Sequence, residues 1–287
     1  MLGKYCLVTG GTAGIGLATA RELVRKGASV TIVGRDAARG DSAVTAIRAA
    51  TGRDTVDFFA ADLSDQRRLR AFATAFRERR PKLDVLINNA GGLFGRRRLS
   101  ADGIEMTFAL NHLNYFLLTH LLLPSLRAAA PSRIVNVASE AHRGVSLRFD
   151  DLQGEVRYNR WLAYKRSKLA NLLFTYELSR RLTGQGVTAN ALHPGFVATD
   201  IGVRHAFVPG ILWRIGKLAA IGVEKGAETS IYLASAPDIA GMSGAYFIDC
   251  RSARSSKASY DQQAALRLWD VSANLTKVSD YENPADL

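Results

Sequence analysis

An α/β fold with a doubly wound parallel sheet is predicted for this 287-residue chain by two features of its sequence. Short apolar runs alternate along the chain with segments of about ten to twenty residues in which apolar side chains recur at helical spacing. Such alternation is typical of right-handed βαβ units, which place helices on both faces of a parallel sheet. The runs are continuously apolar, as expected of strands that are covered on both sides.

The first half of the chain supplies four strands, and each ends in residues that favour a turn. The predicted strands 5–8 and 29–33 end in Thr9-Gly10-Gly11 and Gly34, and the strands 56–60 and 85–87 end in Asp62-Leu63 and in Asn88-Asn89-Ala90-Gly91. Helical spacing of apolar or alanine residues, with Gly27 and Pro81 as stops, predicts helices over 14–26, 36–50 and 65–80.

The second half adds three strands, at 134–137, 187–192 and 246–248, which makes seven in all. The helices predicted there span 103–127, 161–182, 204–219, 224–235 and 258–274. No internal repeat or break in composition divides the chain. We therefore expect a single domain over residues 1–277 and a polar tail over 278–287.

The composition argues against a disordered chain, a membrane-spanning protein and a small disulfide-rich secreted protein. Hydrophobic residues make up 47% of the chain and charged residues 22%, which is typical of a globular protein. No stretch has the roughly 18 apolar residues of a membrane span, and no signal peptide is evident. The two cysteines, Cys6 and Cys250, are expected to be reduced thiols in a cytoplasmic protein.

The net charge of +12 favours anionic partners, but the basic residues are spread along the chain. Local clusters such as Arg96-Arg97-Arg98 are not interleaved with aromatic residues, so we expect solvated arginines and no nucleic-acid partner. His142 and His193 have no ligand partner at a suitable spacing, so no metal is predicted.

A glycine-rich turn follows the first predicted strand and opens a helix. Glycines there permit a tight turn and a close approach of the backbone to a pyrophosphate, which the helix N-terminus attracts. This arrangement predicts a Rossmann-type dinucleotide site. The predicted cofactor-binding residues of this turn are Gly10, Thr12, Gly14, Ile15 and Gly16.

Further cofactor-binding residues are predicted at the ends of the next strands. Arg35 stands where a carboxylate would select NAD, and an arginine suits a 2′-phosphate; solvation of an exposed Arg35 is the alternative. Asp62, Leu63, Asn88, Ala90 and Gly91 are expected to border the adenine and its ribose, although each could also act as a helix cap or turn residue.

The catalytic candidates lie after the fifth strand. Ser139 follows it directly, and Tyr164 and Lys168 share one face of the next helix because they are four residues apart. A phenol titrates near 10, too high for acid/base work at neutral pH. One positive charge about 4 Å away contributes up to roughly 4 kcal/mol, about three pKa units, so a lysine can bring the tyrosine into range.

Taken together, these residues resemble the short-chain dehydrogenase/reductase superfamily from about residue 3 to residue 250, and most closely its retinol dehydrogenase-like branch. The resemblance rests on the turn at 10–16, Asn88 to Gly91, Asn111, Ser139, Tyr164 with Lys168, and Pro194-Gly195, which stand in the superfamily's order. Segments 34–36, 149–153 and 191–195 resemble the branch itself. Family members often begin with an apolar anchor, which this chain lacks, and Ala13 replaces a frequent hydroxyl residue.

The resemblance implies hydride transfer between NADP(H), with NAD(H) as the alternative, and a carbonyl/alcohol pair. Tyr164 would then be the general acid/base, Ser139 would orient the substrate oxygen, and Lys168 would bind the nicotinamide ribose and lower the tyrosine pKa. Asn111 would hold a water that links Lys168 to solvent. Pro194, Gly195 and Thr199 would border the nicotinamide.

The segment 202–222 is rich in apolar residues and is expected to cover the substrate side. A lid of this kind favours a lipophilic substrate such as a retinoid, long-chain aldehyde, steroid or xenobiotic ketone. An amphipathic helix at a core or dimer interface, and peripheral membrane contact, are the alternatives for this segment. A homodimer that pairs the helices 103–127 and 161–182 is a further expectation. The competing functions are a nucleotide-binding scaffold without turnover and a reductase of carbon–carbon double bonds.

Overall fold

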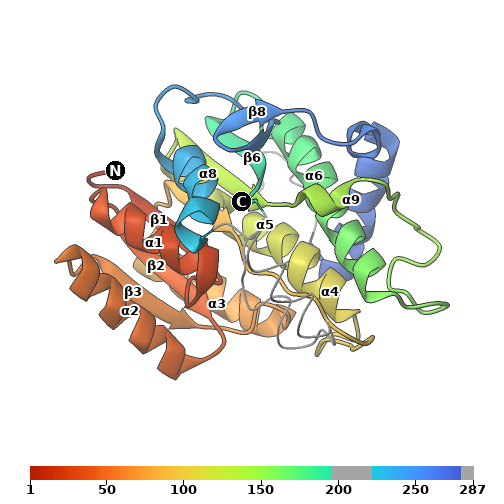
Figure 1. Cartoon of the computed structure of the whole chain (residues 1–287), viewed down its shortest axis with the longest axis horizontal. Coiled ribbons are helices and arrows are strands. Elements are labelled where there is room, and N and C mark those ends of the chain that lie inside the picture. The colour runs from red at the N-terminus through yellow and green to blue at the C-terminus, as the bar shows by residue number, and fades with distance from the viewer. Residues whose placement is uncertain (196–221, 279–287) are drawn as a thin grey trace.

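The computed structural model describes residues 1–195 and 222–278. These residues form one continuous sheet with the strand order β3-β2-β1-β4-β5-β6-β7-β8, and helices cover both of its faces (Figure 1). Neighbouring strands from β3 to β7 are parallel. The predicted doubly wound α/β fold is therefore confirmed.

The strands lie close to their predicted positions because their apolar runs are buried on both sides. Their bounds are β1 (Tyr5–Thr9), β2 (Ser29–Gly34), β3 (Val56–Ala60), β4 (Val85–Asn88), β5 (Ser132–Val137), β6 (Val187–His193), β7 (Tyr246–Ile248) and β8 (Arg251–Ala253).

The helices form two layers, one on each face of the sheet. The first layer holds α1 (Gly14–Arg25), α2 (Ala37–Thr51) and α8 (Val223–Ser235), which pack on Val8, Ile32 and other buried strand residues. The second holds α3 (Gln66–Arg79), α5 (Asn114–Ala128), α6 (Arg160–Arg181) and α9 (Gln262–Thr276), which pack on Leu7, Leu86 and Ile134. The helix predicted at 204–219 lies outside the described residues.

An eighth strand corrects the predicted count of seven. β8 pairs antiparallel with β7 through a two-residue turn, Asp249-Cys250, in which both residues have positive φ (47° and 61°). Two positive φ values are characteristic of the tight turns whose twist matches a hairpin. Neither residue is a glycine, so the sequence carried no usual signal for this hairpin.

The long helix predicted at 103–127 is divided. It begins as α4 (Met106–Phe108), continues as a π-helical turn (Ala109–Leu113) and then becomes α5. The buried Glu105 side chain accepts hydrogen bonds from the backbone of Thr107 and Phe108, which fixes the start three residues later than predicted. Single π-helical turns often occur at functional sites, and this one contains Asn111.

The last predicted helix, 258–274, is also divided. A 3₁₀ turn, η3 (Lys257–Tyr260), comes first, and Asp261 then caps α9 by accepting a hydrogen bond from the backbone of Ala264. On α9, Leu268 and Trp269 pack against apolar residues of α6.

This packing bears on the predicted homodimer. Residues 167–178 of α6 are all buried within the single chain, largely because α9 covers the helix. The predicted homodimer stays a prediction. Within the described residues, no helix is both long and apolar enough to cross a membrane.

Candidate active site

The sheet order reverses between β1 and β4, and the carboxyl ends of the strands open a crevice there, where ligands bind in folds of this kind. The glycine-rich turn occupies one side of this crevice. Gly10 and Gly14 adopt positive φ values of 66° and 54°, which favour glycine. A Cβ atom on Gly16 would lie 2.3 Å from the Gly10 carbonyl oxygen, so the helix can approach the strand only without a side chain.

The N-terminus of α1 faces this crevice without a side-chain cap. Its N-cap residue, Ala13, makes no side-chain hydrogen bond to the first turn. Uncapped backbone N–H groups together with the positive end of the helix dipole bind anions. The turn is thus suited to hold a pyrophosphate.

Asn89, which the sequence analysis did not single out, ties this turn to β4. Its Nδ2 donates to the Thr9 carbonyl oxygen over 2.8 Å. In return, the Thr9 hydroxyl accepts hydrogen bonds from the backbone N–H groups of Asn89 (2.8 Å) and Ala90 (3.0 Å). The position of Asn89 in the Asn-Asn-Ala-Gly run was visible in the sequence, but its partner lies 80 residues away.

A cavity of about 410 Å³ adjoins the turn at the ends of β1, β2 and β4. Six of the predicted cofactor-binding residues line it, namely Gly10, Thr12, Arg35, Leu63, Ala90 and Gly91. Arg39 and Asp36 line it as well and were not predicted to bind the cofactor.

The charged side chains that line this cavity are two arginines and one aspartate, so positive charge is in excess. Asp36 caps α2 by accepting from the backbone N–H of Arg39 over 3.1 Å, and its other oxygen lies 3.3 Å from Arg39 Nε. One helix end and one guanidinium therefore already balance this carboxylate. Arg35 adds a further positive charge, so the cavity suits an anionic group better than a pair of ribose hydroxyls.

The other residues predicted to border the adenine and the pyrophosphate have different surroundings. The Asp62 carboxylate accepts hydrogen bonds from the backbone N–H and the hydroxyl of Ser64, at 3.0 and 2.7 Å. Asn88 is fully buried and donates to Thr119 and Asn136, in the polar interior beneath the crevice. Ile15 packs in a small apolar cluster between α1 and α8.

The catalytic candidates meet at the ends of β5 and α6. Ser139 begins a 3₁₀ turn, η2 (Glu140–His142), and its hydroxyl accepts a hydrogen bond from the backbone of Ala141 over 3.2 Å. The Ser139 side chain lies close enough to the Tyr164 phenol to lower its pKa. Lys168 Nζ donates to the Val137 carbonyl oxygen over 2.9 Å and lies 5.7 Å from the centre of the Tyr164 ring.

Burial shifts both titratable groups. It lowers the pKa of Lys168 from 10.5 to about 8, because an ammonium loses its hydration in the interior. It also raises the pKa of Tyr164, an effect that the nearby Ser139 side chain opposes. The pKa of Tyr164 expected from the four-residue spacing included the attraction between Lys168 and a phenolate but not this loss of hydration.

Asn111 joins the loop after β4 to α6. Its side-chain oxygen accepts from the Gly92 N–H over 2.7 Å, and its nitrogen donates to the Gly92 carbonyl and to Ser167, each over 3.0 Å. A Cβ atom on Gly91 would lie 3.2 Å from Asn111 Oδ1 and 3.7 Å from Lys168 Nζ, so a glycine keeps this approach open. The Asn111 side chain therefore positions backbone; the predicted water-binding role stays a prediction.

The remaining predicted residues follow β6. Pro194 and Gly195 are partly exposed, and Gly195 has a positive φ of 84°. Thr199 lies outside the described residues, as does the segment 202–222 except for its last residue. The role of the segment 202–222 as a substrate cover stays a prediction.

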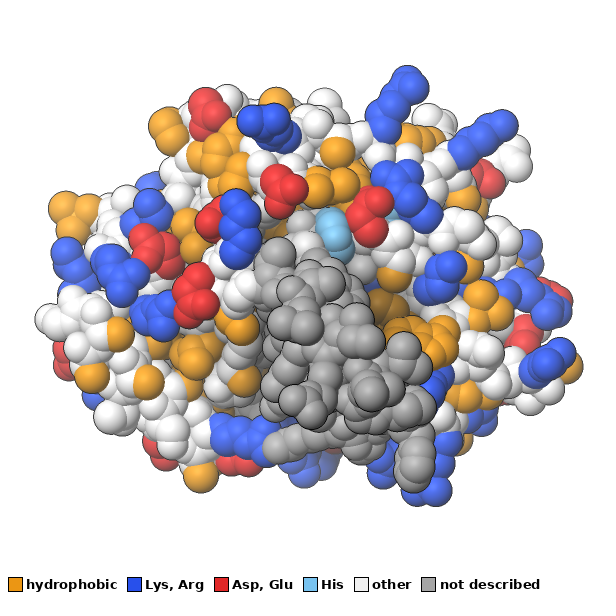
Figure 2. Space-filling model, viewed as in Figure 1, with side chains coloured by type: hydrophobic (Ala, Val, Ile, Leu, Met, Phe, Trp, Pro, Cys, Tyr) orange, Lys and Arg blue, Asp and Glu red, His pale blue; other side chains and the backbone are white. Residues whose placement is uncertain are grey.

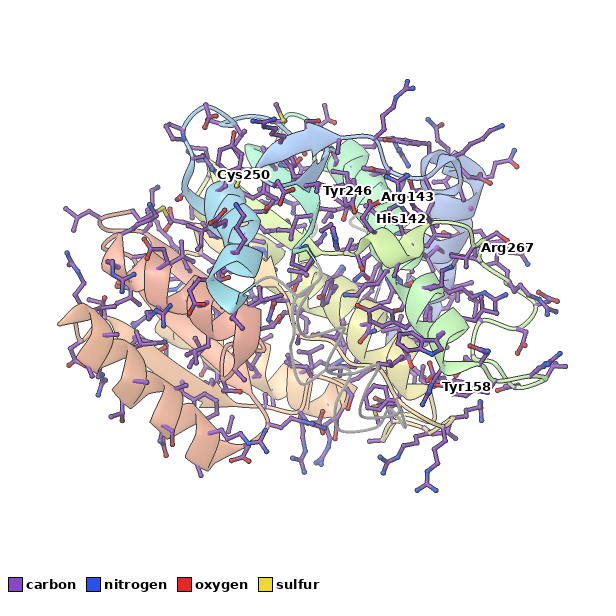
Figure 3. All side chains as sticks on the ribbon, in the orientation of Figure 1. His142, Arg143, Tyr158, Tyr246, Cys250 and Arg267 are labelled. Atoms are coloured by element: carbon purple, nitrogen blue, oxygen red, sulfur yellow. The ribbon has the colours of Figure 1, made fainter. Side chains whose placement is uncertain are left out.

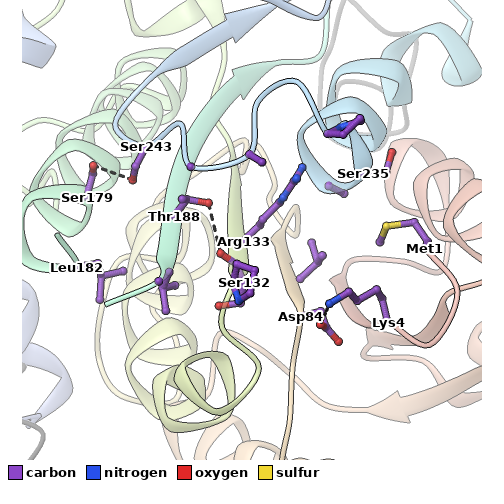
Figure 4. Close-up of a pocket in the computed structure, with 18 of the residues that line it drawn as sticks. Met1, Lys4, Asp84, Ser132, Arg133, Ser179, Leu182, Thr188, Ser235 and Ser243 are labelled. Carbon is purple, nitrogen blue, oxygen red and sulfur yellow. Dashed lines mark hydrogen bonds and ion pairs between the residues drawn. The ribbon is translucent and has the colours of Figure 1, made fainter. Parts of the chain in front are cut away.

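A larger cavity, of about 760 Å³, lies at the amino ends of the strands, away from the crevice at their carboxyl ends (Figure 4). Residues at the amino ends of the strands line it, including Lys4, Asp84 and Arg133. Lys4 pairs with Asp84, and Arg133 donates to the Leu233 carbonyl near the end of α8, so the charged groups there are used within the fold. None of the described residues predicted for the active site lines this cavity.

The surface charge is dispersed. Figure 2 shows lysine and arginine side chains spread around the visible face and interspersed with acidic ones. Several are paired, as Arg97 is with Glu155 and Arg80 with Asp57. Among the described residues, no group of three His, Cys, Asp or Glu side chains could hold a metal ion.

Comparisons with known proteins agree with the fold. The short-chain dehydrogenase family model matches residues 4–206, so the chain belongs to this family of oxidoreductases. It is 46% identical to retinol dehydrogenase 12 of Mus musculus over 273 residues, which cover 95% of this chain and 86% of the relative. It is 44% identical to mouse retinol dehydrogenase 14, over 95% of this chain and 85% of that protein.

Two solved structures have the same fold. An uncharacterised protein from Mycobacterium paratuberculosis aligns with a TM-score of 0.80 and 33% identity, over 97% of this chain and 95% of its own. A Pseudomonas aeruginosa RhlG/NADP complex aligns with a TM-score of 0.70 and 28% identity, over 91% of this chain and 97% of its own. The predicted family and branch are thus confirmed, whereas the cytoplasmic location stays a prediction.

Proposed function

We propose that this protein transfers a hydride between NADP(H) and a lipophilic carbonyl/alcohol pair, with Tyr164 as the general acid/base. The observation that carries the proposal is the convergence of Ser139, Tyr164 and Lys168 beside a crevice suited to a dinucleotide. The retinol dehydrogenases to which the chain is similar support an alcohol or aldehyde as the reacting group.

In the reductive direction, Tyr164 gives its proton to the substrate oxygen. The Ser139 hydroxyl, whose side chain acts on the pKa of the phenol, orients the same oxygen. Lys168, held by the Val137 carbonyl, provides a positive charge that favours the phenolate left after proton transfer. When bound, the nicotinamide supplies the hydride, and the protein supplies the alignment.

The described residues fit a dinucleotide at four points. The backbone N–H groups at the start of α1 would hold the pyrophosphate, and the cavity behind them would take the adenosine. Arg35 would pair with the 2′-phosphate of NADP(H), with Arg39 beside it. Lys168 would reach the nicotinamide ribose past Gly91, where the absence of a side chain leaves space.

The substrate is proposed to be lipophilic. It rests on the names of the relatives and on the apolar composition of the segment 202–222, which we propose covers the substrate. A cover of this kind would exclude water and so strengthen the hydrogen bonds at the reacting oxygen.

The test is an NADPH-oxidation screen with retinal, decanal and acetaldehyde, repeated with NADH. We expect turnover of retinal and decanal with micromolar KM, much weaker use of acetaldehyde, and a preference for NADPH. A preference for NADH would overturn the cofactor assignment, and a KM that does not depend on chain length would overturn the substrate assignment. Identification of the product as an alcohol would separate carbonyl reduction from reduction of a double bond.

A further inference from the structure

The turn that follows Ser139 is held by side chains from distant parts of the chain. Tyr246 on β7 donates from its hydroxyl to Glu140 Oε1 over 2.9 Å. His193, at the end of β6, accepts from the Glu140 backbone N–H over 3.3 Å. Arg143 pairs with Glu140 and donates to the Arg254 carbonyl over 2.7 Å. The position of Ser139 is therefore coupled to the segment that follows β8.

His142 lies within this group of contacts, near Arg143 and Tyr246 (Figure 3). Its Nδ1 lies 2.6 Å from the Ser139 carbonyl oxygen, and its Nε2 accepts from the Ser256 backbone N–H over 2.9 Å. An N–H group can only donate and a carbonyl can only accept. The proton of the neutral ring must therefore be on Nδ1, so the two backbone partners fix the tautomer.

The surroundings of His142 hold the ring in one place. It is fully buried and meets the Tyr246 ring edge to face, with 5.5 Å between the ring centres. The turn it belongs to has only three residues, and the backbone bonds that close it are 3.1 and 3.2 Å long. A turn this short contributes little stability of its own, so contacts from outside decide where Ser139 points.

We propose that His142 is a positioning residue for Ser139: its Nδ1–H holds the Ser139 carbonyl and so orients the hydroxyl, while its Nε2 anchors the turn to Ser256. This inference rests on the proposed function, since it assumes that the Ser139 hydroxyl acts on the substrate oxygen. A displacement of about 1 Å at such a group can lower turnover by about 10²-fold.

The anchor depends on a neutral ring. A proton on Nε2 would place two donors against each other, Nε2–H and the Ser256 N–H. Burial lowers the pKa of His142, and the charged or titratable groups that face it are Glu140 and Arg143 on its own turn, Tyr246 on β7 and His193 on β6. The ring is thus neutral at neutral pH, and acid should release the anchor.

The first test compares two substitutions that each keep one contact. In His142→Asn the amide nitrogen can take the place of Nδ1, and in His142→Gln the amide oxygen can take the place of Nε2. We expect Asn to keep kcat within about threefold of the wild type and Gln to lower it about 10- to 100-fold, with unchanged Kd for NADPH in both. The two variants serve as controls for each other, because each loses one buried hydrogen bond and their Tm values should fall alike.

A second variant tests the anchor alone. Ser256 has a φ of −71°, which proline also adopts, so Ser256→Pro removes the N–H donor at little backbone cost. Without that donor, protonation of Nε2 is less unfavourable, and the acid limb of the kcat–pH profile should move to higher pH. The limb should be absent in His142→Asn. A merely structural histidine would give a lower Tm but no such movement.

The outcomes separate the two proposals. If none of the carbonyl compounds supports NADPH oxidation by the wild-type protein, the proposed function fails. The tautomer of His142 can still be tested in that case, through the ¹⁵N shifts of its ring. If the wild type turns over and the Asn and Gln variants have equal kcat, or the Ser256→Pro profile does not move, the inference about His142 is overturned while the proposed function stands.

Discussion

The two sides of the crevice are built in opposite ways. On the β1–β2 side, glycines at 10, 14 and 16 have no side chain and so let backbone N–H groups and a helix end approach a ligand. On the β5–β6–β7 side, side chains form the site: Ser139 is held by His142, and Lys168 by the Val137 backbone carbonyl. The first side is suited to bind, and the second to orient a proton donor.

This difference makes a general prediction. Changes on the glycine side should alter the Kd of the cofactor and leave the chemical step intact. Changes at Ser139 or Tyr164, on the β5–β6–β7 side, should alter kcat and leave the cofactor Kd intact. Three substitutions test this separation, from the largest expected effect to the smallest, and a fourth, at Lys168, tests the cost of burying a charge.

Tyr164→Phe should have the largest effect. Loss of the phenolic hydroxyl removes the proton donor, and general acid/base catalysis contributes about 10²–10⁴-fold. We expect kcat with retinal to fall by about 10³-fold and the Kd for NADPH, measured by quenching of protein fluorescence, to stay within twofold. An equal fall in cofactor affinity would show that the two sides are not separate, and unchanged turnover would remove Tyr164 from the mechanism.

Arg35→Asp tests the glycine side through its charge. A charge-assisted hydrogen bond contributes about 1.5–3 kcal/mol, so the Kd for NADPH should rise about 10- to 100-fold while that for NADH changes little. The matched control is Arg53→Asp, on an exposed residue outside the cavity lining. Equal effects on both cofactors, or none, would count against a 2′-phosphate contact at Arg35.

Gly16→Ala tests the close approach of α1 to the turn. The added methyl group would meet the Gly10 carbonyl at 2.3 Å, a contact that only a backbone shift can relieve. Overpacking of this kind costs about 1–3 kcal/mol, so we expect a several-fold weaker Kd for NADPH and a lower Tm. A lower kcat at saturating NADPH would contradict the separation.

The same difference explains what the sequence could and could not predict. The glycine turn and Arg35 lie within 26 positions of each other, and their signals are local, so the cavity that they line could be anticipated. His142 and Ser256 are 114 residues apart, and no local pattern predicts that a histidine will accept from a distant backbone N–H. The hairpin of β7 and β8 was missed for a related reason, since Asp249 and Cys250 adopt positive φ without a glycine.

Electrostatics show the same limit. The spacing of Tyr164 and Lys168 correctly placed them on one helix face, but it could not show how deeply each would be buried. Burial determines the direction of both shifts, raising the pKa of Tyr164 and lowering that of Lys168. A spacing argument supplies the attraction between two groups, and only the packed structure supplies the cost of removing them from water.

Lys168→Met should show that cost directly, as a change in the stability of the cofactor-free protein. The folded pKa of Lys168, about 8, lies below its ordinary value of 10.5, so the folded protein binds this proton less readily than the unfolded chain. Below pH 8 the buried ammonium therefore destabilises the cofactor-free protein, by up to about 3 kcal/mol, and this penalty is relieved as the pH rises from 8 to about 10.5. We expect Lys168→Met to raise the Tm of the cofactor-free protein at pH 7 by a few degrees, to remove the rise in stability between pH 8 and 10.5, and to abolish turnover. Thermal unfolding at pH 7, 8.5 and 10 measures this, with Lys165→Met, a partly exposed neighbour on the same helix, as the control. A lower Tm at pH 7 would mean that the hydrogen bond to the Val137 carbonyl contributes more to stability than burial of the charge removes.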